Sequence, residues 1–268
     1  MQKAAGLEYE IRGEGEPVLL IHGAHFTDSY VSLMEKPALA PYRLIRYRRR
    51  GYAGSLPHSG PFSIKETAQD ARALLKTLDI ERAHIVGHSS GGVIALQLAL
   101  DAPELVHSLT LLEPALMQVP SAPGFFEAVA PAVAKYSQGD GRGAIHAFIG
   151  MMAGENWRDD IARMVPGGPE QADKDVATFF EVELQAVGGW TFNQELARQI
   201  VQPVLFVLGS ESGPFFAEAW TLCEQWIPQT EGFLIEGANH LLHQQNPAIS
   251  AEVARGMAQF FARHPMEA

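Results

Sequence analysis

The sequence contains one cysteine, Cys223, among its 268 residues. A lone cysteine cannot form a disulfide within the chain, and it excludes a metal site built from several cysteines. Long apolar runs are also missing: none reaches the roughly 18 residues that span a bilayer. The first residues lack the apolar segment of a signal peptide. We therefore expect a soluble, cytoplasmic protein with no membrane partner.

Basic residues are scarce. Lysine and arginine number 20 against 31 aspartates and glutamates, which gives a formal net charge of −11. Because nucleic-acid binding needs a basic surface, we expect no nucleic-acid partner. The concentrated basic patch, which we interpret as a solvated strand end and loop, consists of Arg46, Arg48, Arg49 and Arg50. Hydrophobic residues make up 47% of the chain, enough for a large core, and this excludes a disordered protein.

The first half of the chain alternates short apolar runs with amphipathic stretches. The runs at 18–22, 43–47, 83–87 and 108–112 predict buried strands, and 63–78 and 91–100 predict helices. Ser63, with Glu66 three residues later, forms the sequence pattern of a capping box. Strands that alternate with helices over short connections indicate a parallel sheet covered on both faces.

That alternation stops between residues 114 and 202, where glycine and proline separate helical segments and no strand is predicted. It resumes with strands at 203–208 and 232–236 and helices at 215–226 and 247–261. We predict an α/β fold with a mostly parallel, doubly wound sheet, in which residues 1–114 and 202–268 form the core. Residues 115–201 are predicted to form a helical cap, inserted between two strands, over the carboxyl ends of the sheet.

Ser89 lies at the centre of the pentapeptide GHSSG, directly after one predicted strand and before a predicted helix. In that setting the motif G-x-S-x-G forms a nucleophile elbow, because side chains in place of the glycines would collide with the neighbouring strand and helix. The elbow directs the serine towards the N-terminus of the helix, where free N–H groups favour an oxyanion. Ser89 is therefore the predicted nucleophile, and His88 is assigned a packing or hydrogen-bonding role.

A second motif, HGAH at 22–25, follows the first buried strand. Its glycine allows a sharp turn that can aim the N–H of Ala24 into the site, where it would pair with the N–H of Ser90 as an oxyanion hole. We expect His22 to brace this loop. His25 could line the pocket, and the sequence leaves its role open.

A serine hydroxyl needs a base within hydrogen-bond reach, and the chain has ten histidines. His240 follows the last predicted strand in the segment GANH, 151 residues after Ser89, in the chain order serine, acid, histidine. We predict His240 as the base. His243 is its close competitor and is expected to face solvent or the cap.

Four stretches together resemble the α/β-hydrolase superfamily, in its serine-nucleophile branch with a helical lid. They are IHGA at 21–24, RRGYAGS at 49–55, IERAHIVGHSSGG at 80–92 and GANHLLHQQNP at 237–247. The resemblance covers nearly the whole chain outside the insert. It departs from the family at Arg48, where relatives often have aspartate. The serine argues against the dehalogenase and epoxide-hydrolase branches, which have aspartate in its place.

The resemblance also implies an acid that orients the histidine. Most relatives have aspartate three residues after the glycine that ends the strand at 203–208, a position that Ser212 occupies here. Two glutamates could substitute. Glu211 is one residue early, whereas Glu113 ends the strand before, where some branches of the superfamily place the acid. We favour Glu113 and keep Glu211 as the alternative.

These residues predict a serine hydrolase that forms an acyl-enzyme, resembling a carboxylesterase for small hydrophobic acyl groups, with no cofactor or metal. The pocket is inferred from apolar residues of the insert: Phe125, Phe126, Phe148, Met151, Met152, Trp157, Phe179, Phe180 and Trp190. Alternatives are carbon–carbon hydrolysis of ring-fission products, which Leu241 after the histidine disfavours, and non-catalytic binding of small molecules. An aminopeptidase could use Glu181 and Glu183, although a solvated helix face explains them more simply. The partner is a small-molecule substrate, and the sequence leaves homo-oligomer formation open.

Overall fold

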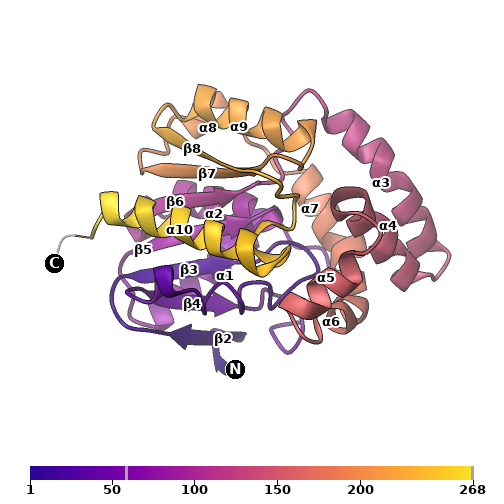
Figure 1. Cartoon of the computed structure of the whole chain (residues 1–268), viewed down its shortest axis with the longest axis horizontal. Coiled ribbons are helices and arrows are strands. Elements are labelled where there is room, and N and C mark those ends of the chain that lie inside the picture. Colours follow the sequence, from indigo (N-terminus) through magenta and orange to yellow (C-terminus); the bar gives the residue numbers. More distant parts are fainter. Residues whose placement is uncertain (58–59, 267–268) are drawn as a thin grey trace.

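The computed structural model describes residues 1–57 and 60–266, and its centre is one sheet of eight strands with the order β1-β2-β4-β3-β5-β6-β7-β8 (Figure 1). Strands β3 to β8 run parallel, and β1 and β2 are antiparallel additions at one edge. This arrangement confirms the predicted α/β fold with a mostly parallel sheet. The strands are β1 (Gln2–Ala4), β2 (Leu7–Arg12), β3 (Pro17–Ile21), β4 (Arg43–Tyr47), β5 (Ala83–His88), β6 (Val106–Leu112), β7 (Val204–Gly209) and β8 (Thr230–Ile235).

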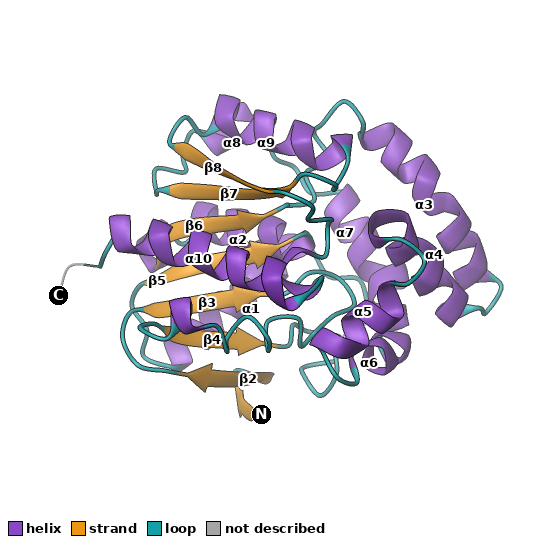
Figure 2. Ribbon diagram, viewed as in Figure 1, coloured by secondary structure: helices purple, strands orange, loops and turns teal. Residues whose placement is uncertain are grey.

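Helices cover both faces of this sheet, with α10 (Pro247–Arg263) in front and α1 (Ile64–Thr77) and α2 (Ser90–Asp101) behind it (Figure 2). Successive side chains of a strand point to opposite faces. On β3, Leu19 and Ile21 therefore pack in the core that contains α1, α2 and α9 (Pro214–Trp226), whereas Leu20 packs with α10. Burial on both faces explains the nearly continuous apolar runs of the central strands.

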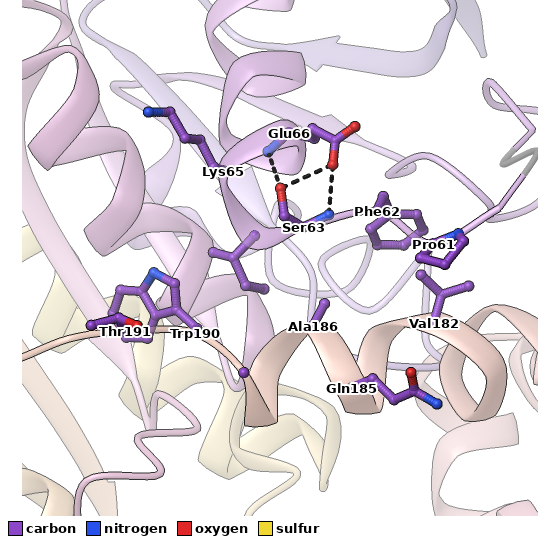
Figure 3. A pocket seen from close by; sticks show the side chains of 12 residues that line it. Pro61, Phe62, Ser63, Lys65, Glu66, Val182, Gln185, Ala186, Trp190 and Thr191 are labelled. Atoms are coloured by element: carbon purple, nitrogen blue, oxygen red, sulfur yellow. Dashed lines mark hydrogen bonds between the residues drawn. The ribbon is translucent and has the colours of Figure 1, made fainter.

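The predicted capping box is present at the start of α1. The N–H of Glu66 donates to Ser63 Oγ at 3.2 Å, and the N–H of Ser63 donates to Glu66 Oε2 at 2.8 Å (Figure 3). These two bonds satisfy N–H groups that the first turn of a helix leaves free. The helix therefore begins where the sequence pattern places it.

Between β6 and β7 the chain forms helices and no strand, and α3 to α6 lie beyond the carboxyl ends of the parallel strands (Figure 1). They share an apolar cluster of their own, which also contains Phe26 and Leu241 from the loops after β3 and β8. The division into a core and a cap at residues 115 and 201 stays a prediction. The helices are α3 (Ala122–Ser137), α4 (Gly141–Ala153), α5 (Trp157–Met164), α6 (Gly168–Lys174), the π-helix η3 (Thr178–Glu183), α7 (Leu184–Gly188) and α8 (Gln194–Ala197).

The prediction that the basic patch is a solvated strand end was wrong. Arg46 and Arg49 are buried, Arg48 and Arg50 are half-buried, and each forms an ion pair with a carboxylate from another segment. The reason is topological: β4 lies between β2 and β3, so the arginines at its end are surrounded by other elements. Across the described residues, no helix is long and apolar enough to cross a membrane.

Candidate active site

Ser89 connects β5 to α2 in a strained turn. Its backbone has φ 54° and ψ −120°, a conformation that residues with a side chain rarely adopt. The Ser89 N–H donates to the carbonyl of Leu112 at 2.9 Å, and the Ser89 carbonyl accepts from Ala115 N–H at 3.1 Å. The turn is therefore fixed to the end of β6, at the carboxyl edge of the sheet.

The two glycines of the motif are required by close packing, as the sequence predicts. A Cβ on Gly87 would lie 2.3 Å from the carbonyl oxygen of Gly91, and one on Gly91 would lie 2.2 Å from the carbonyl oxygen of Ile21. Both distances are shorter than any real Cβ contact. Glycine is needed here because the elbow brings strand, turn and helix this close together.

The loop after β3 lies directly beside the elbow. A Cβ on Gly23 would come within 3.1 Å of Ser89 Cβ, so glycine permits the approach. The next residue, Ala24, lines a cavity together with Ser89 and Ser90. Within the described part of the chain, the N–H groups of Ala24 and Ser90 donate to no other group. Both donors are thus available to an oxyanion.

His240, in the loop after β8, is hydrogen-bonded to Glu113 and not to Glu211. The Nδ1 atom of His240 lies 2.6 Å from Glu113 Oε2, and Glu113 Oε1 accepts from the N–H of Gly209 at 2.7 Å. Glu113 is fully buried, His240 is 4% exposed, and the backbone of Glu113 has φ 46°. A carboxylate accepts hydrogen bonds only, so Nδ1 of His240 donates to Glu113, and Nε2 is the ring nitrogen left to act as a base.

The loop after β7 contains Glu211, the alternative acid, and Ser212, which occupies the position where most relatives have the aspartate. Glu211 is exposed, and its backbone N–H donates to Ala238 at 2.9 Å while its side chain lines an outer cavity. Ser212 Oγ is buried without a hydrogen-bond partner. The structure therefore brings Glu113, and neither residue of this loop, to the histidine.

Two aromatic rings hold His240 in place. Phe216 stacks on it with ring centroids 4.0 Å apart, and His88 Nε2 bonds to the His240 carbonyl at 2.9 Å. His88 does not line the cavity, and it directly precedes Ser89. Its hydrogen bond therefore joins the loop after β8 that carries His240, called the base loop below, to the elbow at Ser89. This agrees with the packing and hydrogen-bonding role that the sequence predicts for it.

His243 does not face solvent or the helices above the sheet, and that prediction was wrong. It is fully buried and stacks on Tyr30 with ring centroids 4.5 Å apart. Burial, with a smaller contribution from His240, lowers the pKa of His243 to about 3. Its ring also lies edge-on to His88, with ring centroids 5.1 Å apart, four residues before α10 begins.

His25 lies among aromatic rings behind the cavity. Its ring is 4.4 Å from Phe179 and 5.5 Å from Phe148, measured between centroids, and neither of its nitrogens has a hydrogen-bond partner. Burial lowers the pKa of His25 to about 4. It does not line the cavity, whereas both phenylalanines do.

The cavity at Ser89 has a volume of about 30 Å³ and is mostly apolar. None of the described residues that line it is ionisable. From the insert, Phe125, Phe148, Met152 and Phe179 contribute to its wall, whereas Trp157 and Phe180 are core residues and Phe126 is exposed. The lining is completed by Ala24, Ser89, Ser90, Ala115, Met117, Leu184, Val187, Phe215 and Phe216.

Larger cavities lie outside this one, and two of them involve helices of the insert. The outer cavity, of about 410 Å³, shares Phe125, Met152, Phe215 and Phe216 with the inner one, so these side chains separate the two. The other, of about 470 Å³, lies between the start of α1 and α7 (Figure 3). It contains none of the predicted catalytic residues, although Trp190, which was predicted for the substrate pocket, lies in its wall.

Sequence reasoning missed a buried ion pair beside the site. Arg49 Nη2 lies 2.7 Å from Glu183 Oε1, and the side chains are 2% and 1% exposed. The prediction that Glu183 sits on a solvated helix face was therefore wrong, although Glu181 is exposed. Glu183 is also engaged by Tyr52, so it is not free to bind a substrate amine. The motif RRGYAGS contains Arg49 and Tyr52 and was the available signal.

Known proteins resemble this chain in sequence and in fold. The family model described as alpha/beta hydrolase fold matches residues 16–247. A pimeloyl-[acyl-carrier protein] methyl ester esterase of Aeromonas salmonicida is 26% identical over 91% of this chain and 95% of that protein. A relative named as a carbamate hydrolase, from Azorhizobium caulinodans, is 39% identical over 40% of this chain, and the match spans only 41% of that relative's length.

Among solved structures, the enol-lactonase of Burkholderia xenovorans LB400 superposes with a TM-score of 0.76. The two share 19% identity over 96% of each chain. At this identity the likeness shows the fold alone. Because it covers 96% of this chain, it includes helices between β6 and β7.

Proposed function

This chain belongs to the alpha/beta hydrolase fold family, and from that premise we propose that it is a serine hydrolase that cleaves carboxylic esters of small hydrophobic acids. The observation that carries the proposal is the 2.6 Å hydrogen bond between His240 and Glu113, beside a strained serine that faces an apolar cavity. A serine alone occurs in many turns. A serine turn tied to a buried histidine–carboxylate pair supports nucleophilic catalysis.

In the proposed reaction, Ser89 Oγ attacks the ester carbonyl while His240 Nε2 takes the hydroxyl proton. The tetrahedral intermediate then expels the alcohol, which receives that proton from His240. Water, deprotonated by the same nitrogen, attacks the acyl-enzyme and releases the acid and free Ser89. Throughout, Glu113 holds the tautomer of His240 and stabilises the imidazolium. The N–H groups of Ala24 and Ser90 stabilise the negative oxygen of both intermediates.

The dimensions of the cavities support a small acyl group. The inner cavity has room for about two water molecules, so even a short acyl chain must displace side chains of its wall. Phe125 and Met152 stand between it and the outer cavity of about 410 Å³. We assign the acyl group to the inner cavity and substrate entry to the outer one.

The charges of the cavities favour a neutral substrate. The inner cavity has no ionisable residue in its described lining, and the outer one contains the carboxylate of Glu211. A buried carboxylate without a cation is costly, which disfavours ring-fission products because they carry one. The relatives named for methyl-ester and carbamate hydrolysis also act on a carbonyl bonded to a heteroatom.

The test is steady-state hydrolysis of nitrophenyl esters from acetate to octanoate, beside a lactone and a ring-fission product. We expect the highest kcat/KM for short acyl chains and a steady fall with chain length. Ser89→Ala should reduce kcat by about 10⁴- to 10⁶-fold. The matched control is Ser137→Ala, at an exposed serine at the end of α3, which should keep the wild-type rate.

Cleavage of the ring-fission product without cleavage of any ester would replace the proposal with carbon–carbon hydrolysis. Turnover of none of these compounds, with saturable binding of one, would favour a binding protein.

A further inference from the structure

We propose that the buried ion pair between Arg49 and Glu183 is a positioning device for catalysis, which fixes the peptide that presents the Ala24 N–H to the oxyanion. This inference rests on the proposed serine hydrolase function. Neither residue lines the inner cavity, so both act through the oxyanion loop and not by touching the substrate.

The connection runs through one peptide unit. Arg49 Nη2 donates to the carbonyl oxygen of Gly23 at 3.0 Å. That carbonyl and the N–H of Ala24 belong to the same planar peptide and point in opposite directions. A donor that holds the Gly23 carbonyl therefore also fixes the direction of the Ala24 N–H. It polarises the peptide as well, which makes that N–H a stronger donor.

His22 reinforces the same carbonyl. The backbone N–H of Arg49 donates to His22 Nε2 at 3.0 Å, so the ring proton lies on Nδ1, which is 2.6 Å from the Gly23 carbonyl oxygen. Burial and the nearby Arg49 charge lower the pKa of His22 well below its usual value, which keeps the ring neutral. The Gly23 carbonyl thus receives two donors, and both depend on where Arg49 lies.

Glu183 determines where Arg49 lies. Its Oε1 accepts from Arg49 Nη2 at 2.7 Å, and its Oε2 accepts from the hydroxyl of Tyr52. Burial opposes ionisation of Glu183, but the Arg49 charge and the hydrogen bonds from Ser90, Tyr52 and Arg49 together outweigh it, so the pKa of Glu183 is lowered and the pair stays charged. A buried arginine without this carboxylate would turn away from Gly23 to find another partner.

The pair also links the oxyanion loop to the cavity wall. Glu183 ends the π-helix η3, and insertions of this kind are frequent at functional sites. Phe179 of the same helix and Leu184, the next residue, line the inner cavity. On the other side of this segment, Val182 and Gln185 border the open cavity in Figure 3. One ion pair therefore fixes both the donor and the wall around Ser89.

Folding alone is a weaker explanation for the pair. Thr178 Oγ1 donates to the Gly51 carbonyl at 2.5 Å, and the Ala53 N–H donates to Asp175 Oδ1 at 3.1 Å. These bonds already hold the loop after β4 against the helices. Buried ion pairs, moreover, can often be replaced by apolar residues without loss of stability.

The experiment compares Glu183→Gln with the apolar replacement Arg49→Met/Glu183→Leu. For each we would measure kcat and KM for a short ester, affinity for an alkyl boronic acid that mimics the tetrahedral intermediate, and Tm. For Glu183→Gln we expect kcat about 10- to 100-fold lower, KM within threefold, and boronic acid affinity reduced by a similar factor to kcat. The double variant should keep a Tm near wild type and still lose at least tenfold in kcat.

Asp70→Asn is the matched control, because Asp70 pairs with the neighbouring Arg50 at 2.5 Å, away from the cavity. It should leave kcat within twofold of wild type. Tyr52→Phe, which removes one hydroxyl from the pair and keeps the ring, should lower kcat about three- to tenfold, and it decides the question if the other variants do not fold.

The inference is overturned if the folded double variant, or in its absence Tyr52→Phe, hydrolyses the ester at the wild-type rate. It is also overturned if kcat falls without any change in boronic acid affinity. Failure of the proposed function looks different: wild-type protein would then neither hydrolyse the ester nor bind the boronic acid.

Discussion

The ends of β6 and β7 lie side by side at the candidate site but play different parts. The loop after β6 begins with Glu113, which is fully buried and bonded to His240. The loop after β7 is mostly exposed, and Gly209, the last residue of β7, has the N–H that donates to Glu113. One strand end supplies a carboxylate, and its neighbour supplies a donor that holds it.

This difference shows what decides the position of an acid at a sheet edge. Glutamate has one methylene more than aspartate, and the left-handed backbone of Glu113 turns its side chain along the edge towards the base loop. Gly209 in turn has no room for a side chain, since a Cβ there would lie 2.3 Å from the Ala238 carbonyl oxygen. Burial of the carboxylate and a nearby donor matter more than the strand that carries it.

The largest expected effect comes from removing the carboxylate of the loop after β6. In Glu113→Gln, the neutral amide no longer stabilises the imidazolium, and His240 can adopt the wrong tautomer. We expect kcat to fall about 10³- to 10⁴-fold at a similar KM. Steady-state kinetics with a short nitrophenyl ester measure this change.

The same substitution in the loop after β7 is the control. Glu211→Gln should change kcat by less than about threefold, because the side chain is exposed and not bonded to His240. Equal losses in the two variants, or a larger loss for Glu211→Gln, would reverse the assignment of the acid.

A smaller effect should follow from moving the acid to the other loop. A Cβ on Gly209 would lie 2.8 Å from Ser212 Oγ, so Ser212 lies beside the glycine whose N–H donates to Glu113. Adding Ser212→Asp to Glu113→Gln should restore kcat about tenfold above the single variant, since a carboxylate again faces the imidazolium. No gain in a folded double variant would mean that the loop after β7 cannot serve the histidine.

The smallest effect concerns His243, in the loop after β8 that also carries His240. With a pKa of about 3 when folded and about 6.5 when unfolded, His243 binds more protons in the unfolded chain between these values. Stability therefore falls as pH is lowered from 6.5 towards 3, and from pH 7 to 5 this one residue removes about 2 kcal/mol. In His243→Phe, the free energy of unfolding should no longer include this contribution to its pH dependence.

Urea unfolding at pH 7 and pH 5 measures the His243 effect directly. The wild type should lose more stability on acidification than His243→Phe does. Identical losses would show that His243 takes up its proton in the folded state as well.

The fold and half of the site follow from local sequence patterns. Strand alternation, the capping box at Ser63 and the elbow at Ser89 depend on residues only a few positions apart, which is why they were predictable. His240 could be proposed as the base because it follows a strand in the expected chain order. The acid was narrowed to two residues, and the hydrogen bond of Glu113 to His240 distinguishes them.

Buried charges could not be predicted. The motif RRGYAGS draws attention to Arg49, but Glu183 lies 134 residues away, and nothing near Glu183 indicates that it pairs with Arg49. His243 likewise looks like a loop residue until Tyr30 and α10 enclose it. Whether a polar side chain is solvated depends on distant partners, and a single sequence does not contain that information in local form.

The central claim is that Ser89 is a nucleophile activated by His240. It is tested most directly by incubating the protein with an alkyl fluorophosphonate and mapping the adduct by mass spectrometry. The account predicts one phosphonyl group, on the peptide that contains Ser89, and no adduct in Ser89→Ala. An unlabelled wild-type protein, or the same labelling in Ser89→Ala, would contradict it.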